Sequence, residues 1–292
     1  APSDRRTMMF SATLPASIEK LARTYQTDAV RIKTIDEHSQ HLDIDYQAIT
    51  VAKQDRENAI INILRFHDAE NALVFCNTRI AVNRMVSRLN NRGFSVVALS
   101  GEFSQNERTH ALQAMRDGRA RVCVATDVAA RGIDLPKLEL VVHADLPSNP
   151  DTLLHRSGRT GRAGRKGVSA LMVDVKGKGR AERVLRFAKI NAVWANPPSA
   201  NDVNKRDEER MLANPMMTDE ANTEETAFAA RLLEQFSPQQ IATAFLRLSQ
   251  AGRSAPEDIE AVSVHNPKAR DFKDKPSRAD RKSGKQSSDF EK

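Results

Sequence analysis

The sequence predicts an α/β protein with a doubly wound parallel sheet, followed by a small α-helical extension and a disordered basic tail. Between residues 41 and 176, short apolar runs alternate with longer amphipathic segments. The apolar runs occupy 72–75, 96–99, 122–124, 140–142 and 170–173. Because they are apolar on both faces, they are typical of strands in a parallel sheet that is covered by helices. After residue 176 no strand is predicted, which indicates a change of architecture.

The segments between the runs carry the start and stop signals of helices. Residues 81–89 hold apolar side chains at helical spacing, and Gly93 follows as a C-terminal cap. The next helix opens at Ser104, has Glu107 in the position of a capping box, and stops at Gly118. Ligands of such doubly wound sheets bind beyond the carboxyl ends of the strands. We therefore expect functional residues directly after the apolar runs.

Composition narrows the class of protein. The 292 residues are 40% hydrophobic and 28% charged, and 45 Lys and Arg against 38 Asp and Glu give a net charge of +7. A basic excess of this size permits a polyanionic partner. No apolar run is long enough for a membrane-spanning helix, and Cys76 and Cys123 lie inside apolar runs. We expect a cytoplasmic protein without a membrane partner, a disulfide framework or a metal cluster.

We divide the chain into four regions: 1–40, with a short helix after Pro15; the α/β domain 41–176; a helical extension 177–260; and the tail 261–292. In the extension, Trp194 is interpreted as a packing anchor of a linker, and Ser237 as the N-cap of the last helix. Two helical faces there are apolar, formed by Phe228, Leu232 and Phe236 and by Ile241, Phe245 and Leu248. They predict either a homodimer or a hairpin packed on the α/β domain. The tail has more Lys and Arg than Asp and Glu and few large apolar residues, which predicts disorder.

An arginine- and glycine-rich segment at 155–165 carries the strongest functional signal. Its glycines would let the backbone approach an anion, and guanidinium groups grip phosphate through two parallel hydrogen bonds. Arg159 and Arg162, three residues apart, can converge on one transferring phosphoryl group as arginine fingers. The alternative is a solvated basic loop or a general RNA-binding patch. The position of this segment after an α/β unit and the spacing of its glycines favour the role in nucleotide binding.

Two further groups follow the apolar runs. Residues 125–134 form a turn rich in small residues, where backbone N–H groups can meet phosphates. Asp134 could accept hydrogen bonds from a ribose or orient an arginine, or it could be a helix cap or a surface ion-pair partner. The other group follows two neighbouring runs and the start of a helix, where the dipole favours phosphate: Asn77, Thr78, Arg79, Ser100, Gly101, Gln105 and Arg108.

These motifs together resemble the C-terminal part of a DEAD-box RNA helicase. Residues 11–13 (Ser-Ala-Thr) resemble motif III of that family, residues 73–79 motif IV, and Ser100 to Arg108 motif IVa. Residues 125–134 resemble motif V, and 155–164 motif VI, with Ser157 where isoleucine is commoner. The resemblance covers about residues 1–176. The extension and tail are more loosely similar to those of bacterial cold-shock-type helicases.

The resemblance implies a RecA-like domain at 41–176, preceded at 1–40 by the end of a first RecA-like domain and a linker. It implies ATP as substrate, with Arg159 and Arg162 at the γ-phosphate, Asp134 and Gly132 in the nucleotide site, and His155 among the catalytic residues. Ser11, Thr13 and Arg156 would couple the two domains, with His155 facing Ser11 and Thr13. The residues implied in holding the RNA backbone are Asn77, Thr78, Arg79, Gly101, Gln105, Arg108 and Thr126. Such contacts read no base sequence.

The 292 residues contain neither a phosphate-binding P-loop nor an Asp-Glu-Ala-Asp box. In the family, these supply the phosphate cradle and the Mg²⁺ ligands from the N-terminal domain. We therefore expect ATP with Mg²⁺ as the cofactor of an intact enzyme, and this chain to be an inactive fragment of it that holds no metal ligands. The alternatives are a non-catalytic RNA-binding and dimerisation module, or a DNA helicase of the same superfamily. The tail would add nonspecific RNA affinity or only solubility.

Overall fold

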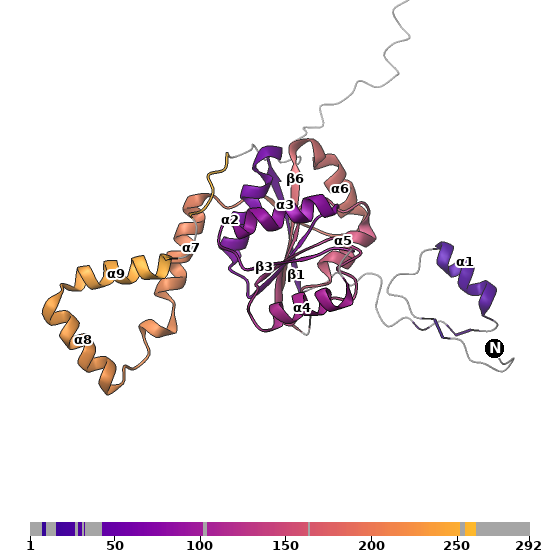
Figure 1. The fold of residues 1–292 in the computed structure, drawn as a ribbon. Helices are drawn as coiled ribbons and strands as arrows, with labels where there is room; N and C mark the ends of the chain where they lie inside the picture. Colours follow the sequence, from indigo (N-terminus) through magenta and orange to yellow (C-terminus); the bar gives the residue numbers. More distant parts are fainter. Residues whose placement is uncertain are drawn as a thin grey trace, which may run out of the picture. The chain divides into compact units, whose positions relative to one another are not determined.

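The computed structural model describes residues 8–9, 16–26, 29–30, 32, 43–101, 104–162, 164–251 and 255–260 (Figure 1). The chain divides into two units, Ala1–Val262 and Ser263–Lys292, and every described residue lies in the first unit. The expectations for Ser11, for Thr13 and for a disordered tail fall outside the described residues.

The centre of the described fold is a seven-stranded sheet in which every pairing is parallel. Its strands are β1 (Ile44–Val51), β2 (Asn71–Phe75), β3 (Val96–Leu99), β4 (Val122–Ala125), β5 (Leu138–His143), β6 (Gly167–Asp174) and β7 (Val193–Ala195). The order across the sheet is β3-β4-β2-β5-β6-β1-β7. The five predicted strands and the α/β fold class are confirmed. After β2, the chain adds β3 and β4 on one side of this strand and then β5 and β6 on the other side. The order of strands therefore reverses at β2, and the crevice expected for a ligand lies beside the carboxyl end of that strand.

The expectation that strands cease after residue 176 is wrong. Strand β7 pairs with β1, with Val193 opposite Gln47 and Ala195 opposite Ile49. A three-residue edge strand is too short to show a hydrophobic period, which explains why the sequence pattern does not reveal it. Trp194 lies in this strand, partly buried, with the Lys178 ammonium 5.4 Å from its ring centre. The α/β domain therefore extends to about residue 195.

Helices cover both faces of the sheet (Figure 1). Ala72 and Val74 point to the face covered by α2 (Arg56–His67) and α3 (Arg79–Asn90), whereas Leu73 and Phe75 point to the opposite face. That second face is covered by α4 (Gln105–Arg116), α5 (Pro150–Ser157) and α6 (Lys178–Phe187). The alternation follows from the two-residue period of a strand, and it explains why the strands are apolar throughout.

Side-chain caps determine where the helices next to the sheet edge begin. The Thr78 hydroxyl accepts the Ala81 N–H at the start of α3. Ser104 and Glu107 form the predicted capping box of α4. The Asn149 side chain accepts the Thr152 N–H at 2.8 Å, and Pro150 follows it as the first residue of α5. These caps place the first turn of each helix beyond a strand end.

The remaining described helices are α1 (Ala16–Tyr25), which confirms the helix expected after Pro15, and α7 (Ala200–Leu212), α8 (Thr223–Gln235) and α9 (Pro238–Gln250). Short 3₁₀ turns occupy Lys53–Asp55, Val175–Gly177 and Pro215–Met217. Helix α7 packs on α2 through the fully buried Val203 and the ion pair of Arg65 with Asp207 at 2.7 Å. Neither α8 nor α9 contains a buried residue.

In the described part of the chain, no helix combines the length and the apolar composition needed to cross a bilayer.

Candidate nucleotide and RNA site

Arg156 connects three strand ends at the carboxyl edge of the sheet. Its side chain is 2% exposed and forms two hydrogen bonds with the Asp127 carboxylate, at 2.5 and 2.7 Å. It also donates to the Asp145 carbonyl at 2.8 Å and to the Asn77 side-chain oxygen at 3.0 Å. The guanidinium lies 5.1 Å from the centre of the Phe75 ring. A buried arginine with this set of partners holds the segments after β2, β4 and β5 in one arrangement.

A second arginine extends this network. Asp145 accepts the Asn77 backbone N–H at 2.8 Å and the Arg56 guanidinium at 3.2 Å. Arg56 also donates to Asp174, at the end of β6, at 3.2 Å. Apart from Asp127, which lies inside motif V, sequence reasoning missed these carboxylates. The available signal was an acidic residue just after each of the runs 122–124, 140–142 and 170–173.

The predicted phosphate-binding arginines lie beside the predicted ribose-binding carboxylate. Arg162 Nη1 is 3.0 Å from an Asp134 oxygen, and the Arg162 Nε donates to the Gly158 carbonyl at 2.8 Å. Arg159 donates to the Ile133 carbonyl at 3.1 Å. Partial burial and, to a smaller extent, the Arg162 charge lower the pKa of Arg159, while Asp134 acts in the opposite direction. Residues from the segment after β4 and from the segment after α5 thus form one cluster, which we call the finger cluster: Asp134, Arg159 and Arg162.

The structure corrects two expectations about segment 155–165. His155, Arg156 and Ser157 form the last turn of α5 rather than a loop, because Asn149 and Pro150 start that helix. The glycines do not all serve the approach of an anion. A Cβ at Gly161, which has φ +65°, would lie 2.5 Å from a carbon of Ile44, and one at Gly167 would lie 2.0 Å from the Thr160 hydroxyl. Gly161 therefore lets the loop pack against the start of β1, and Gly167, the first residue of β6, lets that strand pack against Thr160 of the loop.

The residues expected to hold RNA follow β2, β3 and β4 at the same edge. Asn77, Thr78, Arg79, Gly101 and Gln105 are exposed, and Arg108 and Thr126 are partly exposed. Thr78 caps α3, and Arg79 and Gln105 are the first residues of α3 and α4. Arg108 donates a hydrogen bond to the Arg131 carbonyl, which joins α4 to the segment after β4. The structure brings these residues to one sheet edge.

Three of the predicted site residues lie outside both the finger cluster and the group expected to hold RNA. His155 is exposed on the last turn of α5, and Gly132 has φ +69° in an open turn before Asp134. Arg156 is engaged inside its own domain, which makes it a positioning residue for the strand ends. Its interdomain role, with Ser11 and Thr13, stays a prediction.

Ser157, which departs from the family pattern, belongs to a buried polar trio. Its hydroxyl is 2.9 Å from the Ser169 hydroxyl and 3.4 Å from His143 Nε2, and all three residues are fully buried. Burial and the nearby Arg156 charge lower the pKa of His143 well below its ordinary value, so this imidazole is neutral. Burial likewise raises the pKa of Cys76 and of Cys123 to about 12, so these thiols are inert core residues.

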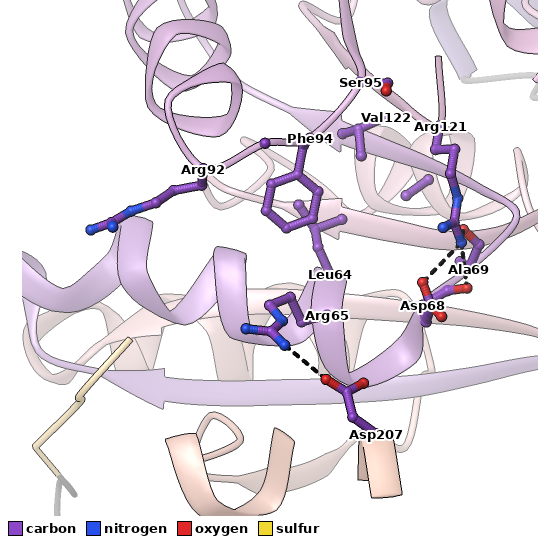
Figure 2. Close-up of a pocket in the computed structure, with 12 residues that line it drawn as sticks. Leu64, Arg65, Asp68, Ala69, Arg92, Phe94, Ser95, Arg121, Val122 and Asp207 are labelled. Atoms are coloured by element: carbon purple, nitrogen blue, oxygen red, sulfur yellow. Dashed lines mark hydrogen bonds and ion pairs between the residues drawn. The ribbon is translucent and has the colours of Figure 1, made fainter. Parts of the chain in front are cut away.

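Figure 2 shows a pocket of about 220 Å³ near the amino ends of β2 and β4, at the opposite edge of the sheet. Two ion pairs lie beside it, Arg65 with Asp207 and Arg121 with Asp68 at 3.0 Å. None of the predicted site residues lines this pocket. It is therefore separate from the candidate nucleotide and RNA site.

Within the described ranges, no group of three or more His, Cys, Asp and Glu side chains could hold a metal ion.

The doubly wound sheet brings the finger cluster and the residues after β2 to β4 to one edge, which is the arrangement that the sequence motifs predict for the C-terminal domain of a helicase. Residues 55–164 match the family described as "Helicase conserved C-terminal domain". The chain is 32% identical over 268 residues to the chloroplastic DEAD-box ATP-dependent RNA helicase 3B of Zea mays, covering 90% of this chain and 36% of that protein. The chain spans between 31% and 44% of the length of the curated relatives it matches.

Solved structures of DEAD-box proteins are also similar to the chain. The E. coli DEAD-box protein SrmB, bound to regulator of ribonuclease activity A, is 33% identical, with 52% of this chain and 90% of that chain covered and a TM-score of 0.50. S. cerevisiae Dbp5, bound to RNA and ADP BeF3, is 27% identical, with 70% and 55% covered and a TM-score of 0.63. The chain belongs to the DEAD-box RNA helicase family and corresponds to its C-terminal, RecA-like part.

Proposed function

We propose that this chain is the C-terminal part of an ATP-dependent RNA helicase that unwinds short RNA duplexes. The finger cluster carries the proposal, because it brings Arg159, Arg162 and Asp134 together at the sheet edge where ligands of this fold bind. In this proposal the P-loop and the Mg²⁺ ligands belong to a preceding RecA-like domain, and ATP lies between the two domains. The relatives are named ATP-dependent RNA helicases, which supports the proposal.

The Arg162–Asp134 ion pair explains how the cluster can receive a nucleotide. The side chains are 46% and 82% exposed, so the pair contributes only about 0–1 kcal/mol to stability. Phosphate oxygens can therefore replace Asp134 as the partner of Arg162, and a ribose hydroxyl can replace Arg162 as the partner of Asp134. The two guanidinium groups would then neutralise charge that develops on the transferring phosphoryl group.

The proposed RNA contact follows from the same sheet edge. Backbone N–H groups at the starts of α3 and α4, together with Arg79 and Arg108, offer positive charge to a phosphodiester chain. The Arg156 network holds the segments after β2 and β4 in place for this contact. Closure of the two domains on ATP and RNA would bend one strand of a duplex, and hydrolysis would reopen the cleft.

The decisive experiment joins this chain to the N-terminal domain of its own coding sequence. We expect negligible ATPase activity from the chain alone and RNA-stimulated turnover from the joined protein. In the joined protein, Arg159→Ala and Arg162→Ala should each lower kcat by about 10³-fold or more, the range of arginine fingers. Arg165→Ala is a matched control, since Arg165 is exposed in the same loop but lies outside the finger cluster.

Full ATPase activity after both finger substitutions would refute the assignment of the fingers. Turnover stimulated by DNA but not by RNA would instead favour a DNA helicase of the same superfamily.

A second proposal concerns oligomeric state. Phe228, Phe236, Phe245 and Leu248 on α8 and α9 are between 42% and 74% exposed. Phe245 also borders a cavity of about 810 Å³ whose lining includes residues of α7 and α9 and Arg65 of α2. We propose that these faces join two copies of the chain, which would hide the apolar surface from water. An RNA-binding and dimerising module without catalysis is the competing function.

Size-exclusion chromatography with light scattering on the full chain tests this proposal. We expect a dimer for the unmodified chain and a monomer for Phe236→Asp with Leu248→Asp. Gln239→Glu is the control, because Gln239 is a polar, exposed residue on the first turn of α9 and its replacement should leave the dimer intact. A monomer at high concentration of the unmodified chain would refute dimerisation.

The proposal also covers the tail, residues 261–292, and the location of the protein in the cell. The excess of Lys and Arg in 261–292 supports additional RNA affinity that falls steeply with salt. If RNA affinity is equal with and without these residues, the tail serves solubility instead. Cytoplasmic location is also proposed, and it accords with the free, buried thiols of Cys76 and Cys123.

A further inference from the structure

Residues 255–260, which we call the strap, lie against the α/β domain after α9. The strap centres on Asn62 of α2, whose side chain is fully buried. Asn62 Nδ2 donates to the Glu257 carbonyl at 2.9 Å, and its Oδ1 accepts the Glu257 N–H at 2.8 Å. A side-chain amide thus pairs with the strap backbone in both directions, as one strand pairs with another.

The side chains of the strap find matching partners. The Glu257 side chain is 11% exposed, with Arg92 Nε at 2.6 Å and Arg88 Nη2 at 3.7 Å. Figure 2 shows the Arg92 side chain directed away from Phe94 and the pocket. Ile259 packs on the core cluster formed by α2, α3 and the sheet. Glu257 and Ile259 are two residues apart, so in an extended segment they point to the same side.

Asn62 also binds the start of the extension. Its Nδ2 donates to the Pro198 carbonyl at 2.9 Å, in addition to the Glu257 carbonyl. The chain therefore enters the α7–α9 segment and returns from it at a single buried amide. Without the strap, the Asn62 carbonyl oxygen would lose its partner in an apolar surrounding, which makes the strap part of the packing rather than a surface contact.

We propose that α2 and α3 form a docking groove for an extended segment with the pattern acidic–any–apolar, and that its occupant is the strap of the same chain. The three parts of the groove are the Asn62 amide for the backbone, Arg88 and Arg92 for the Glu257 carboxylate, and the core cluster for Ile259. Docking closes the base of the extension. Glu260 then lines one cavity together with Gln54 and Asp55, which follow the carboxyl end of β1.

Hydrogen exchange at the Glu257 amide of the full chain tests the groove. In the unmodified chain we expect this amide to exchange at least about 100-fold more slowly than an unprotected one, since opening breaks hydrogen bonds, an ion pair and an apolar contact together. Asn62→Ala should accelerate the exchange by about tenfold or more, because it removes both the acceptor of the Glu257 N–H and the donor to the Glu257 carbonyl. Asn83→Ala is the matched control, because Asn83 is exposed on α3 and should leave the rate unchanged.

Ile259→Ser changes no residue of α2 or α3, so it tests the groove even if Asn62→Ala prevents folding. It should accelerate exchange at Glu257 while leaving the β2 and β5 amides protected. The charge swap gives a third measurement: Arg92→Glu should accelerate exchange, and the added Glu257→Arg should slow it again. An unprotected Glu257 amide in the unmodified chain, or a rate that Ile259→Ser does not change, would overturn the proposal. These measurements need neither ATP nor RNA, so their outcome is independent of the helicase proposal.

Discussion

Two arginines of one motif, six residues apart, have opposite environments. Arg156 is 2% exposed and satisfied by Asp127, Asn77 and the Asp145 carbonyl, whereas Arg162 is 46% exposed and paired with the still more exposed Asp134. The first arrangement is rigid because breaking it would strand a buried charge, and the second is easily exchanged for another anion. The comparison teaches that one short motif both holds the sheet edge together and presents an exposed guanidinium group there.

The strongest test of this comparison removes the buried arginine. Arg156→Ala should lower the free energy of unfolding by about 3 kcal/mol, because it removes the hydrogen bonds to the Asp127 carboxylate and leaves the Asp145 carbonyl and the Asn77 side-chain oxygen without this donor. Arg156→Lys should restore only part of the loss, since an ammonium cannot reproduce the two parallel hydrogen bonds to Asp127. Urea unfolding followed by circular dichroism measures both. A loss below about 1 kcal/mol for Arg156→Ala, the range of an exposed pair, would contradict the structural role.

A substitution outside the loop that joins Arg156 and Arg162 can strain this loop while both arginines stay unchanged. Gly167→Ala should cost about 1–3 kcal/mol, because the added methyl group overlaps the Thr160 hydroxyl and the Gly161 backbone. Gly179→Ala is the control, since a Cβ there meets nothing within 4 Å. Thermal unfolding of the two variants gives the comparison. Equal melting temperatures would show that the loop can shift to accept the methyl group.

The buried region should also be sensitive to acid. The pKa of His143 is far below 6.5 in the folded chain, and burial lowers the pKa of His67 to about 4. Below pH 6.5 the unfolded chain takes up protons that the folded chain does not, so stability falls as the pH is lowered. Each histidine contributes a slope of up to about 1.4 kcal/mol per pH unit. Unfolding curves measured at about pH 7.5, 6.5 and 5.5 give this slope.

His143→Gln should reduce the slope in that pH range, and His155→Asn, at an exposed position, should not. An unchanged slope in His143→Gln would assign the acid sensitivity to other groups.

The smallest effect is expected at the exposed arginine. Arg162→Ala should change the free energy of unfolding by less than about 1 kcal/mol, the usual range for a surface ion pair. High salt should reduce even this difference. The same urea unfolding experiment applies, with Arg165→Ala as the control in the same loop. A loss as large as that of Arg156→Ala would show that the finger cluster is structural and would weaken the helicase proposal.

Several elements could be predicted because their signals are local. Ser104 with Glu107 predicts the start of α4, and the apolar runs predict the buried strands. The edge strand β7 could not be predicted, because three residues give no period and only pairing with β1 makes them a strand. Helix α5 was not predicted for a different reason. Its last turn belongs to the arginine-rich segment that was interpreted as a loop, although Asn149 and Pro150 are ordinary signals for the start of a helix.

The carboxylate partners of the arginines were the least predictable part of the site. Asp127, Asp145 and Asp174 are far apart in the chain and meet only because β4, β5 and β6 end at the same edge. An acidic residue follows each of the runs 122–124, 140–142 and 170–173, but sequence spacing does not show which arginine each one pairs with.

By itself, the order of residues determined the fold class, five of the seven strands of the described sheet and the set of phosphate-binding candidates, since hydrophobic period and motif spacing are properties of a local segment; the interior strand β1 (Ile44–Val51) was not predicted. Only the tertiary structure decided which arginine is buried and which is available, because that depends on carboxylates brought together from separate strands. It also decided that residues 255–260 return to Asn62, a contact between segments 195 residues apart. Desolvation and pairing act on neighbours in space, and folding alone makes these residues neighbours.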